Sequence, residues 1–145
     1  VPPPLLYAAV ICLGVLVSVR YPVDFLPQGP ARALGGLLLA AGIALGPVWG
    51  VRTLLMAGTT VRPDKPATRL VTAGPFRFSR NPLYLALTLL YAGIAAMTNS
   101  FWALLLLVPL TVFMSLFVIR REEEHLARIF GEEYRRYKAR VRRWL

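Results

Sequence analysis

The chain has 145 residues, of which 57% are hydrophobic, and a formal net charge of +10. So large an apolar fraction excludes an ordinary soluble domain of this size, because its core could not enclose that much apolar surface. Lys and Arg lie in short stretches between apolar runs. That distribution argues against a nucleic-acid partner and is typical of a protein that crosses a membrane several times.

Four apolar runs are each long enough to span, or nearly span, a hydrocarbon core of about 30 Å as helices. In chain order they cover about residues 5–19, 33–51, 82–97 and 100–119. Backbone groups in lipid must be hydrogen-bonded within the protein, so helix is the expected structure. Pro47 and Pro109 lie inside the second and fourth runs and are expected to kink them. The sequence therefore predicts an all-α, polytopic transmembrane protein with about four membrane-spanning helices.

The segments between the runs differ in charge, and we expect residues 1–145 to form one membrane domain. Residues 1–51 supply two N-terminal transmembrane helices. Residues 52–81 form a basic loop with six Lys or Arg and one Asp, and the tail from Arg120 has nine basic and five acidic residues. Cytoplasmic loops of membrane proteins are enriched in Lys and Arg. The loop and the tail are therefore expected on the cytoplasmic side, and residues 82–145 to form a helical hairpin with a C-terminal helix.

The tail after the fourth run has the pattern of an amphipathic cytoplasmic helix that could lie on an anionic membrane surface. Its apolar positions recur at helical spacing and are Leu126, Ile129, Phe130, Tyr134, Tyr137 and Val141. Gly131 is expected to interrupt the helix.

Asn81 and Pro82 mark the start of the third helix, because Asn is a preferred N-cap and Pro is favoured at the first helical position. The free N–H groups of a helix start, together with Arg77 and Arg80, also make an anion-binding site. The sequence supports both a structural and a ligand-binding interpretation of this junction.

Three consecutive carboxylates, Glu122, Glu123 and Glu124, follow the fourth run. Alone, such a run is most simply a solvated charge cluster. However, the third and fourth runs are joined by only a short uncharged turn, so they form an antiparallel hairpin with axes about 8–10 Å apart. The Asn81 junction and the Glu122–Glu123 pair are therefore predicted at the same membrane face. A donor-rich site would face an acceptor-rich one, which suits a zwitterion that carries hydroxyl groups.

Three motifs occur in order around this hairpin. They are Arg-Asn-Pro-x-Tyr at 80–84, Glu-Glu-x-x-Leu at 122–126 and Phe-Gly-x-x-Tyr at 130–134. From about residue 57 to the end, the chain resembles the isoprenylcysteine carboxyl methyltransferase and phospholipid methyltransferase superfamily. Asn81 stands where that superfamily usually has His, and an amide cannot titrate, so a general-base role at this position is excluded.

The resemblance implies S-adenosylmethionine as cofactor, with S-adenosylhomocysteine as product, in a pocket between the last two helices. Within that pocket we expect Arg80 and Asn81 to hold the methionine carboxylate, and Tyr84 to line the sulfonium. Glu122 and Glu123 would take the ribose hydroxyls or the amino group. The expected catalytic residues are Arg80, Asn81 and Tyr84, and the expected cofactor-binding residues are Arg77, Arg80, Asn81, Pro82, Tyr84, Glu122, Glu123 and Tyr134. No metal site is expected, because the sequence has no His, Cys and carboxylate set at ligand spacing.

The resulting prediction is an integral membrane methyltransferase, in a bacterial inner membrane, whose cofactor site faces the cytoplasm. Its acceptor would be a membrane lipid or a lipid-linked molecule, with a carboxylate favoured because it needs no base. Two alternatives remain, a membrane reductase of the sterol-reductase type that uses NADPH, and a small non-enzymatic membrane subunit or scaffold. The sequence indicates no particular oligomeric state.

Overall fold

The computed structural model describes residues 2–59 and 69–145, and every element in these ranges is helical. The elements are α1 (Pro3–Arg20), α2 (Gln28–Ile43), η1 (Ala44–Val51), α3 (Arg52–Met56), η2 (Gly74–Arg77), α4 (Pro82–Met97), α5 (Phe101–Phe113), η3 (Met114–Ile119), α6 (Arg120–Phe130) and α7 (Glu132–Arg140). The expected all-α fold is confirmed.

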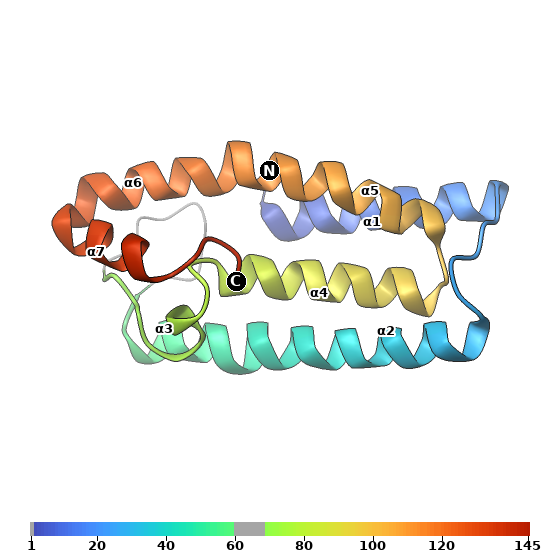
Figure 1. The fold of residues 1–145 in the computed structure, drawn as a ribbon, viewed down its shortest axis with the longest axis horizontal. Helices are drawn as coiled ribbons and strands as arrows, with labels where there is room; N and C mark the ends of the chain where they lie inside the picture. Colours follow the sequence, from blue (N-terminus) through green and yellow to red (C-terminus); the bar gives the residue numbers. More distant parts are fainter. Residues whose placement is uncertain (1, 60–68) are drawn as a thin grey trace.

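Among the described residues, three helical stretches are long and apolar enough to cross a membrane, namely Pro3–Arg20, Gln28–Met56 and Phe101–Phe130. A shorter apolar helix, α4, lies between them in space (Figure 1). The polytopic helical architecture is therefore confirmed, with these three candidate spans and the shorter apolar α4.

At both prolines that were expected to kink a helix, the structure has a π-helical segment in or near that turn. Pro47 lies inside the π-helical segment η1, and the π-helical segment η3 begins shortly after Pro109. A π-helical turn accommodates an extra residue within a helix and so allows the helix to continue where the regular bonding pattern is disturbed. As a result, α2, η1 and α3 form one uninterrupted rod, as do α5, η3 and α6 (Figure 1).

The rods pack closely where α2 meets α4, because small residues bring the two backbones together. A Cβ atom added at Gly35 would lie 2.7 Å from the backbone nitrogen of Met97 and 2.8 Å from the carbonyl oxygen of Gly93. The α4–α5 hairpin reverses at Thr98–Ser100, where the Ser100 hydroxyl accepts a hydrogen bond from the Ala103 N–H at 3.1 Å and caps α5. This hairpin returns the chain to the level at which α4 began.

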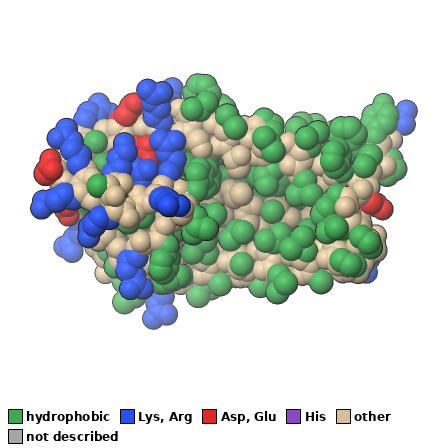
Figure 2. Space-filling view, viewed as in Figure 1, with side chains coloured by type: hydrophobic (Ala, Val, Ile, Leu, Met, Phe, Trp, Pro, Cys, Tyr) green, Lys and Arg blue, Asp and Glu red, His purple; other side chains and the backbone are tan. Residues whose placement is uncertain are grey.

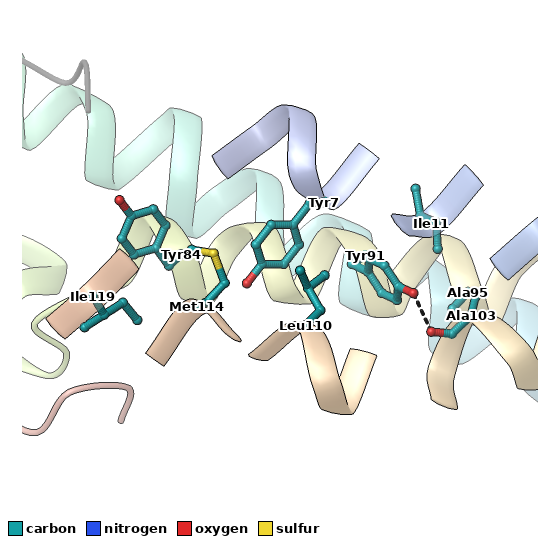
Figure 3. Packing of buried hydrophobic residues seen from close by; sticks show 9 residues of the cluster. All are labelled: Tyr7, Ile11, Tyr84, Tyr91, Ala95, Ala103, Leu110, Met114 and Ile119. Atoms are coloured by element: carbon teal, nitrogen blue, oxygen red, sulfur yellow. Dashed lines mark hydrogen bonds between the residues drawn. The ribbon is translucent and has the colours of Figure 1, made fainter. Parts of the chain in front are cut away.

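The core between α1, α4 and the α5–α6 rod is a row of large side chains (Figure 3). Tyr91 donates a hydrogen bond to the Ala103 carbonyl within it, at 2.5 Å. Tyr84 and Ile119 lie together at one end of the row (Figure 3). That end adjoins the charged part of the molecule.

Lys, Arg, Asp and Glu side chains gather at the end formed by α6 and α7, whereas apolar side chains cover most of the remaining face (Figure 2). The described parts of the basic loop, 52–59 and 69–81, lie at this end together with residues 120–145 (Figure 1). Residues 52–56 of it are helical, as α3. The two segments therefore share one end of the molecule, as predicted. Residues 60–68 of the loop lie outside the described residues.

The tail folds back on the protein. α6 ends at Phe130, Gly131 has φ +55°, and α7 starts at Glu132, so the expected interruption at Gly131 is confirmed. The apolar face of α7 packs against protein side chains, including Leu70 and Phe76. After α7 the chain runs back toward the start of α4 (Figure 1), and Trp144 packs against the central core.

Candidate functional site

The start of α4 and the first turn of α6 lie side by side, which brings most of the predicted site residues together. Arg80 Nη1 lies 2.8 Å from Glu123 Oε2, and the two side chains are only 10% and 8% exposed. The hairpin argument from the sequence is therefore confirmed.

Asn81 occupies the predicted N-cap position of α4, but its side chain does not cap the helix. Instead, Asn81 Nδ2 donates a hydrogen bond to the carbonyl oxygen of Arg143 at 2.9 Å. Pro82 is buried at the first helical position and has no N–H that would need a partner. The amide of Asn81 is thus used to attach the C-terminal segment.

Glu123 is held by two guanidinium groups. Besides Arg80, Arg143 donates from Nη2 to Oε1 at 2.6 Å and from Nε to Oε2 at 3.1 Å. The hydrogen bond from Arg143 to the Glu123 carboxylate raises the pKa of Arg143 further. A buried carboxylate needs such compensation because desolvation of an unpaired charge is costly. Two cations and one anion leave the cluster with a net positive charge.

Arg80 also has an unused donor. Its Nε is buried and has no hydrogen-bond partner within the described residues. A buried donor without a partner costs about 1–3 kcal/mol, so a ligand atom that accepted this hydrogen bond would be stabilised.

Glu122 has a different partner. The Tyr84 hydroxyl donates a hydrogen bond to Glu122 Oε1, and the Tyr84 ring lies at the end of the central core (Figure 3). The two neighbouring carboxylates therefore point to separate groups, Glu122 to a phenol and Glu123 to two guanidiniums.

Tyr134 borders the cluster from α7. Its hydroxyl lies 3.5 Å from Arg80 Nη1, at the limit of a hydrogen bond, and the side chain is 2% exposed. Burial raises the pKa of Tyr134, so its hydroxyl stays neutral. Most of its ring packs in the cluster of Tyr137 and Val141, which limits it to a contact at the edge of the site.

Arg77 is not brought into the cluster. Its side chain is exposed, its Nε donates to the Gly74 carbonyl at 3.2 Å, and its guanidinium lies over the Phe78 ring at 5.6 Å. η2 begins at Gly74, where φ of +59° and the close approach of Thr53 favour glycine.

Sequence reasoning missed Arg143 and the backbone around it. The Arg80 N–H donates to the Arg142 carbonyl at 2.9 Å, and the Ser79 hydroxyl donates to the Arg143 carbonyl at 3.4 Å. Nothing in its residue type distinguishes Arg143 from the other basic residues of the tail. The available signal was Trp144, a large apolar residue at the end of a polar segment.

The set of donors and acceptors fits the cofactor that the sequence implies. Arg80 and Arg143 can bind a carboxylate, while Glu122 and Glu123 can accept hydrogen bonds from an amino group or from hydroxyls. Within the part of the chain that the structure describes, no group of His, Cys, Asp and Glu could hold a metal ion. The geometry therefore favours a polar zwitterionic ligand.

Comparison with known proteins identifies the family. The sequence model of the family described as phospholipid methyltransferase matches residues 30–133. The chain is also similar to an uncharacterized protein of Haemophilus influenzae, with 40% identity over 63 residues, which are 43% of this chain and 100% of that protein. Because the family match covers well over half of its length, the chain belongs to the phospholipid methyltransferase family.

Proposed function

We propose that the protein transfers a methyl group from S-adenosylmethionine to a lipid or lipid-linked acceptor at the cytoplasmic face of a bacterial inner membrane. The observation that carries this proposal is the buried Arg80–Glu123–Arg143 cluster, with its unused Arg80 Nε, next to Glu122 and Tyr84. The cluster lies where the charged end of the molecule meets the apolar helices, so a polar cofactor and a lipid could both reach it.

The ion pairs of the cluster can exchange without leaving a buried charge unpaired. Glu123 contacts both Arg80 and Arg143. If a ligand carboxylate binds one guanidinium, Glu123 keeps the other, which avoids the several kcal/mol that an isolated buried charge costs. Arg80 would hold the methionine carboxylate, Glu122 and Glu123 the amino and hydroxyl groups, and Tyr84 would line the sulfonium.

When bound, the cofactor supplies an electrophilic methyl group, which the acceptor atom displaces in line. The contribution of the protein is to align the reactants and to exclude water. In this proposal both carboxylates are assigned to binding, because Glu122 accepts a hydrogen bond from Tyr84 and would accept from the cofactor, and Glu123 is paired with two arginines. Neither is therefore assigned as a base. Asn81 cannot titrate.

An acceptor that is already nucleophilic at neutral pH suits such a site. A C-terminal carboxyl group, with a pKa of about 3.3–3.7, is ionised without help, whereas an ammonium group must first lose a proton. We therefore favour a carboxylate acceptor of the isoprenylcysteine kind. The test is the methylation rate from about pH 6 to 9 at saturating cofactor. A flat profile supports the carboxylate, and a rise of about tenfold per pH unit would indicate an amine or a thiol.

The decisive binding experiment compares S-adenosylhomocysteine with NADPH on the purified protein in detergent. We expect S-adenosylhomocysteine to bind and NADPH not to bind. Glu123→Gln should weaken binding by roughly 10–150-fold, since it removes a charge-assisted hydrogen bond, and the exposed Glu124→Gln is the matched control. Binding of NADPH alone would favour the reductase alternative, and binding of neither would favour a scaffold.

A further inference from the structure

A concave region lies beside Glu123, between the α5–α6 rod, α7 and the C-terminal segment. Its volume is about 390 Å³, and its charged lining consists of Arg120, Lys138 and Arg143 with Glu123 and Glu124. This volume falls within the range of small-molecule sites. Of the cofactor cluster described above, Glu123 and Arg143 border this region, whereas Arg80, Tyr84 and Glu122 do not line it.

The charges that line this region leave cations available. Glu123 is already compensated by Arg143 and by Arg80, which lies outside the lining. Glu124 contacts Arg120 at 3.4 Å, but both side chains are about two-thirds exposed, so the pair is weak and easily replaced. Lys138 forms no ion pair with any residue that the structure describes. An anion would therefore meet Lys138 and Arg120 at little electrostatic cost.

The part of the lining from η3 includes an exposed apolar side chain. Leu116 lines the region one helical turn before Arg120, and is 52% exposed, as is the neighbouring Phe117. The Ser115 hydroxyl accepts a hydrogen bond from Trp144 Nε1 at 3.0 Å, which leaves its own hydrogen for another acceptor. Cations and a hydroxyl donor thus line the same region as an exposed apolar side chain.

We propose that this region binds the phosphate of an anionic phospholipid, with its acyl chains along Leu116 and Phe117. A phospholipid has a phosphate that the cations and the Ser115 hydroxyl could bind, and acyl chains that could contact Leu116. A soluble anion would leave Leu116 without a partner. The lipid is an accessory ligand, since the site lies beside the predicted cofactor cluster. The inference does not depend on methyl transfer.

The test is native mass spectrometry of the full chain in non-ionic detergent. The probes are short-chain phosphatidylglycerol, phosphatidylcholine with the same acyl chains, and inorganic phosphate. We expect phosphatidylglycerol to bind at least about fivefold more tightly than phosphatidylcholine, the effect of roughly one surface charge. Inorganic phosphate should neither bind measurably nor displace the lipid.

Variants locate the site. Arg120→Gln with Lys138→Gln should lower phosphatidylglycerol affinity by about 25-fold, or roughly fivefold for each cation. The matched control, Arg128→Gln with Arg136→Gln, removes the same charge from exposed positions on the same two helices and should change affinity less than about twofold. Glu124→Gln should raise the affinity, because it removes a negative charge and releases Arg120. If the double variant does not fold, the exposed Lys138→Gln alone supports the same comparison.

Equal losses in the two double variants would overturn the inference, because they would show diffuse attraction to a basic surface. Equal binding of phosphatidylcholine would overturn the anionic assignment, and binding of inorganic phosphate with the affinity of the lipid would overturn the lipid. S-adenosylhomocysteine binding, measured on the same samples, separates the two proposals. If it stays intact while lipid selectivity is absent, only the accessory site is rejected, and the reverse result rejects only the proposed function.

Discussion

Glu122, Glu123 and Glu124 are adjacent in sequence yet occupy three environments within one turn of α6. Glu122 meets the Tyr84 hydroxyl, Glu123 is buried between two arginines, and Glu124 is 63% exposed beside Arg120. Successive helical residues point about 100° apart, so one turn can face the core, the site and the solvent. The same charge therefore has very different energetic consequences at each position.

Glu123→Gln is expected to destabilise the protein by about 3–5 kcal/mol, because it leaves Arg80 buried beside a neutral amide. Glu124→Gln should change stability by less than about 1 kcal/mol, since the Arg120–Glu124 pair is exposed. Thermal unfolding in detergent, without ligand, measures both. If both variants lose less than about 1 kcal/mol, Glu122, Glu123 and Glu124 are better interpreted as a solvated charge cluster.

Asn81 provides a test of how the C-terminal segment is attached. Asn81→Asp replaces the donor to the Arg143 carbonyl with an acceptor, so two oxygens would face each other at the present 2.9 Å. We expect a loss of about 1–3 kcal/mol in stability and weaker S-adenosylhomocysteine binding. Asn81→His can still donate an N–H and should retain most of both. If Asn81→Asp has the stability and the S-adenosylhomocysteine affinity of the wild type, this hydrogen bond does not hold the C-terminal segment in place.

At the scale of elements, apolar run length predicted the membrane helices well. The run at 82–97 coincides with α4 (Pro82–Met97), because Asn81 and Pro82 signal its start and the turn at Thr98–Ser100 its end. The second and fourth runs were predicted too short, since α2–α3 and α5–α6 continue beyond the apolar residues into the charged end. Hydropathy detects lipid contact, and a helix that leaves the lipid no longer has an apolar signal.

The site was predictable as far as chain geometry determined it. A short hairpin must bring Arg80 and Glu123 to the same level, whatever the side chains do. Which of the many basic tail residues would pair with Glu123 was not predictable, because it depends on the path of the chain after α7. That path is set by packing of Val141 and Trp144 and by backbone hydrogen bonds to the start of α4.

Two adjacent glycines of α2 test the close packing against α4. Gly35→Ala would place a Cβ atom against the Met97 backbone nitrogen and the Gly93 carbonyl, neither of which can move easily. We expect a loss of about 1–3 kcal/mol. Gly36→Ala has open space around its Cβ position and should be neutral or slightly stabilising. Thermal unfolding of the two variants side by side decides this, and equal melting temperatures would contradict the observed packing.

At the scale of the whole molecule, the structure separates an apolar bundle from a charged cap (Figure 2). The cap contains its own small core, in which the Tyr137 hydroxyl donates to the carbonyls of Phe76 and Ser79 at 2.7 and 3.3 Å. The C-terminal segment links this core to the bundle through Trp144 and Ser115. Folding of the cap and formation of the site should therefore be coupled.

Alkaline pH should loosen the cap. Burial raises the pKa of Tyr134 and of Tyr137 in the folded protein, whereas unfolded Tyr has a pKa of about 10. The unfolded chain then releases these protons first, so stability is fully present below about pH 10 and falls as pH rises above it. The Tyr137→Phe variant should be less stable than the wild type at neutral pH, but its stability should fall less as the pH is raised above about 10. Parallel curves of melting temperature against pH for the two proteins would refute this assignment.

The charge distribution also makes a prediction about orientation. The cap holds residues 120–145, with nine basic and five acidic side chains, and the connection between α1 and α2 lies at the opposite end (Figure 1). That connection carries Asp24 and follows Arg20, the last residue of α1. Because basic segments are retained in the cytoplasm, we predict a cytoplasmic cap. In a background with Cys12→Ser, which removes the native thiol, an impermeant maleimide applied to intact bacterial cells should label Asp24→Cys. It should label Arg135→Cys, an exposed position on α7, only after lysis. The reverse pattern would place the Arg80–Glu123 cluster outside the cytoplasm, away from any soluble cofactor made there, and would overturn both the topology and the proposed methyl transfer.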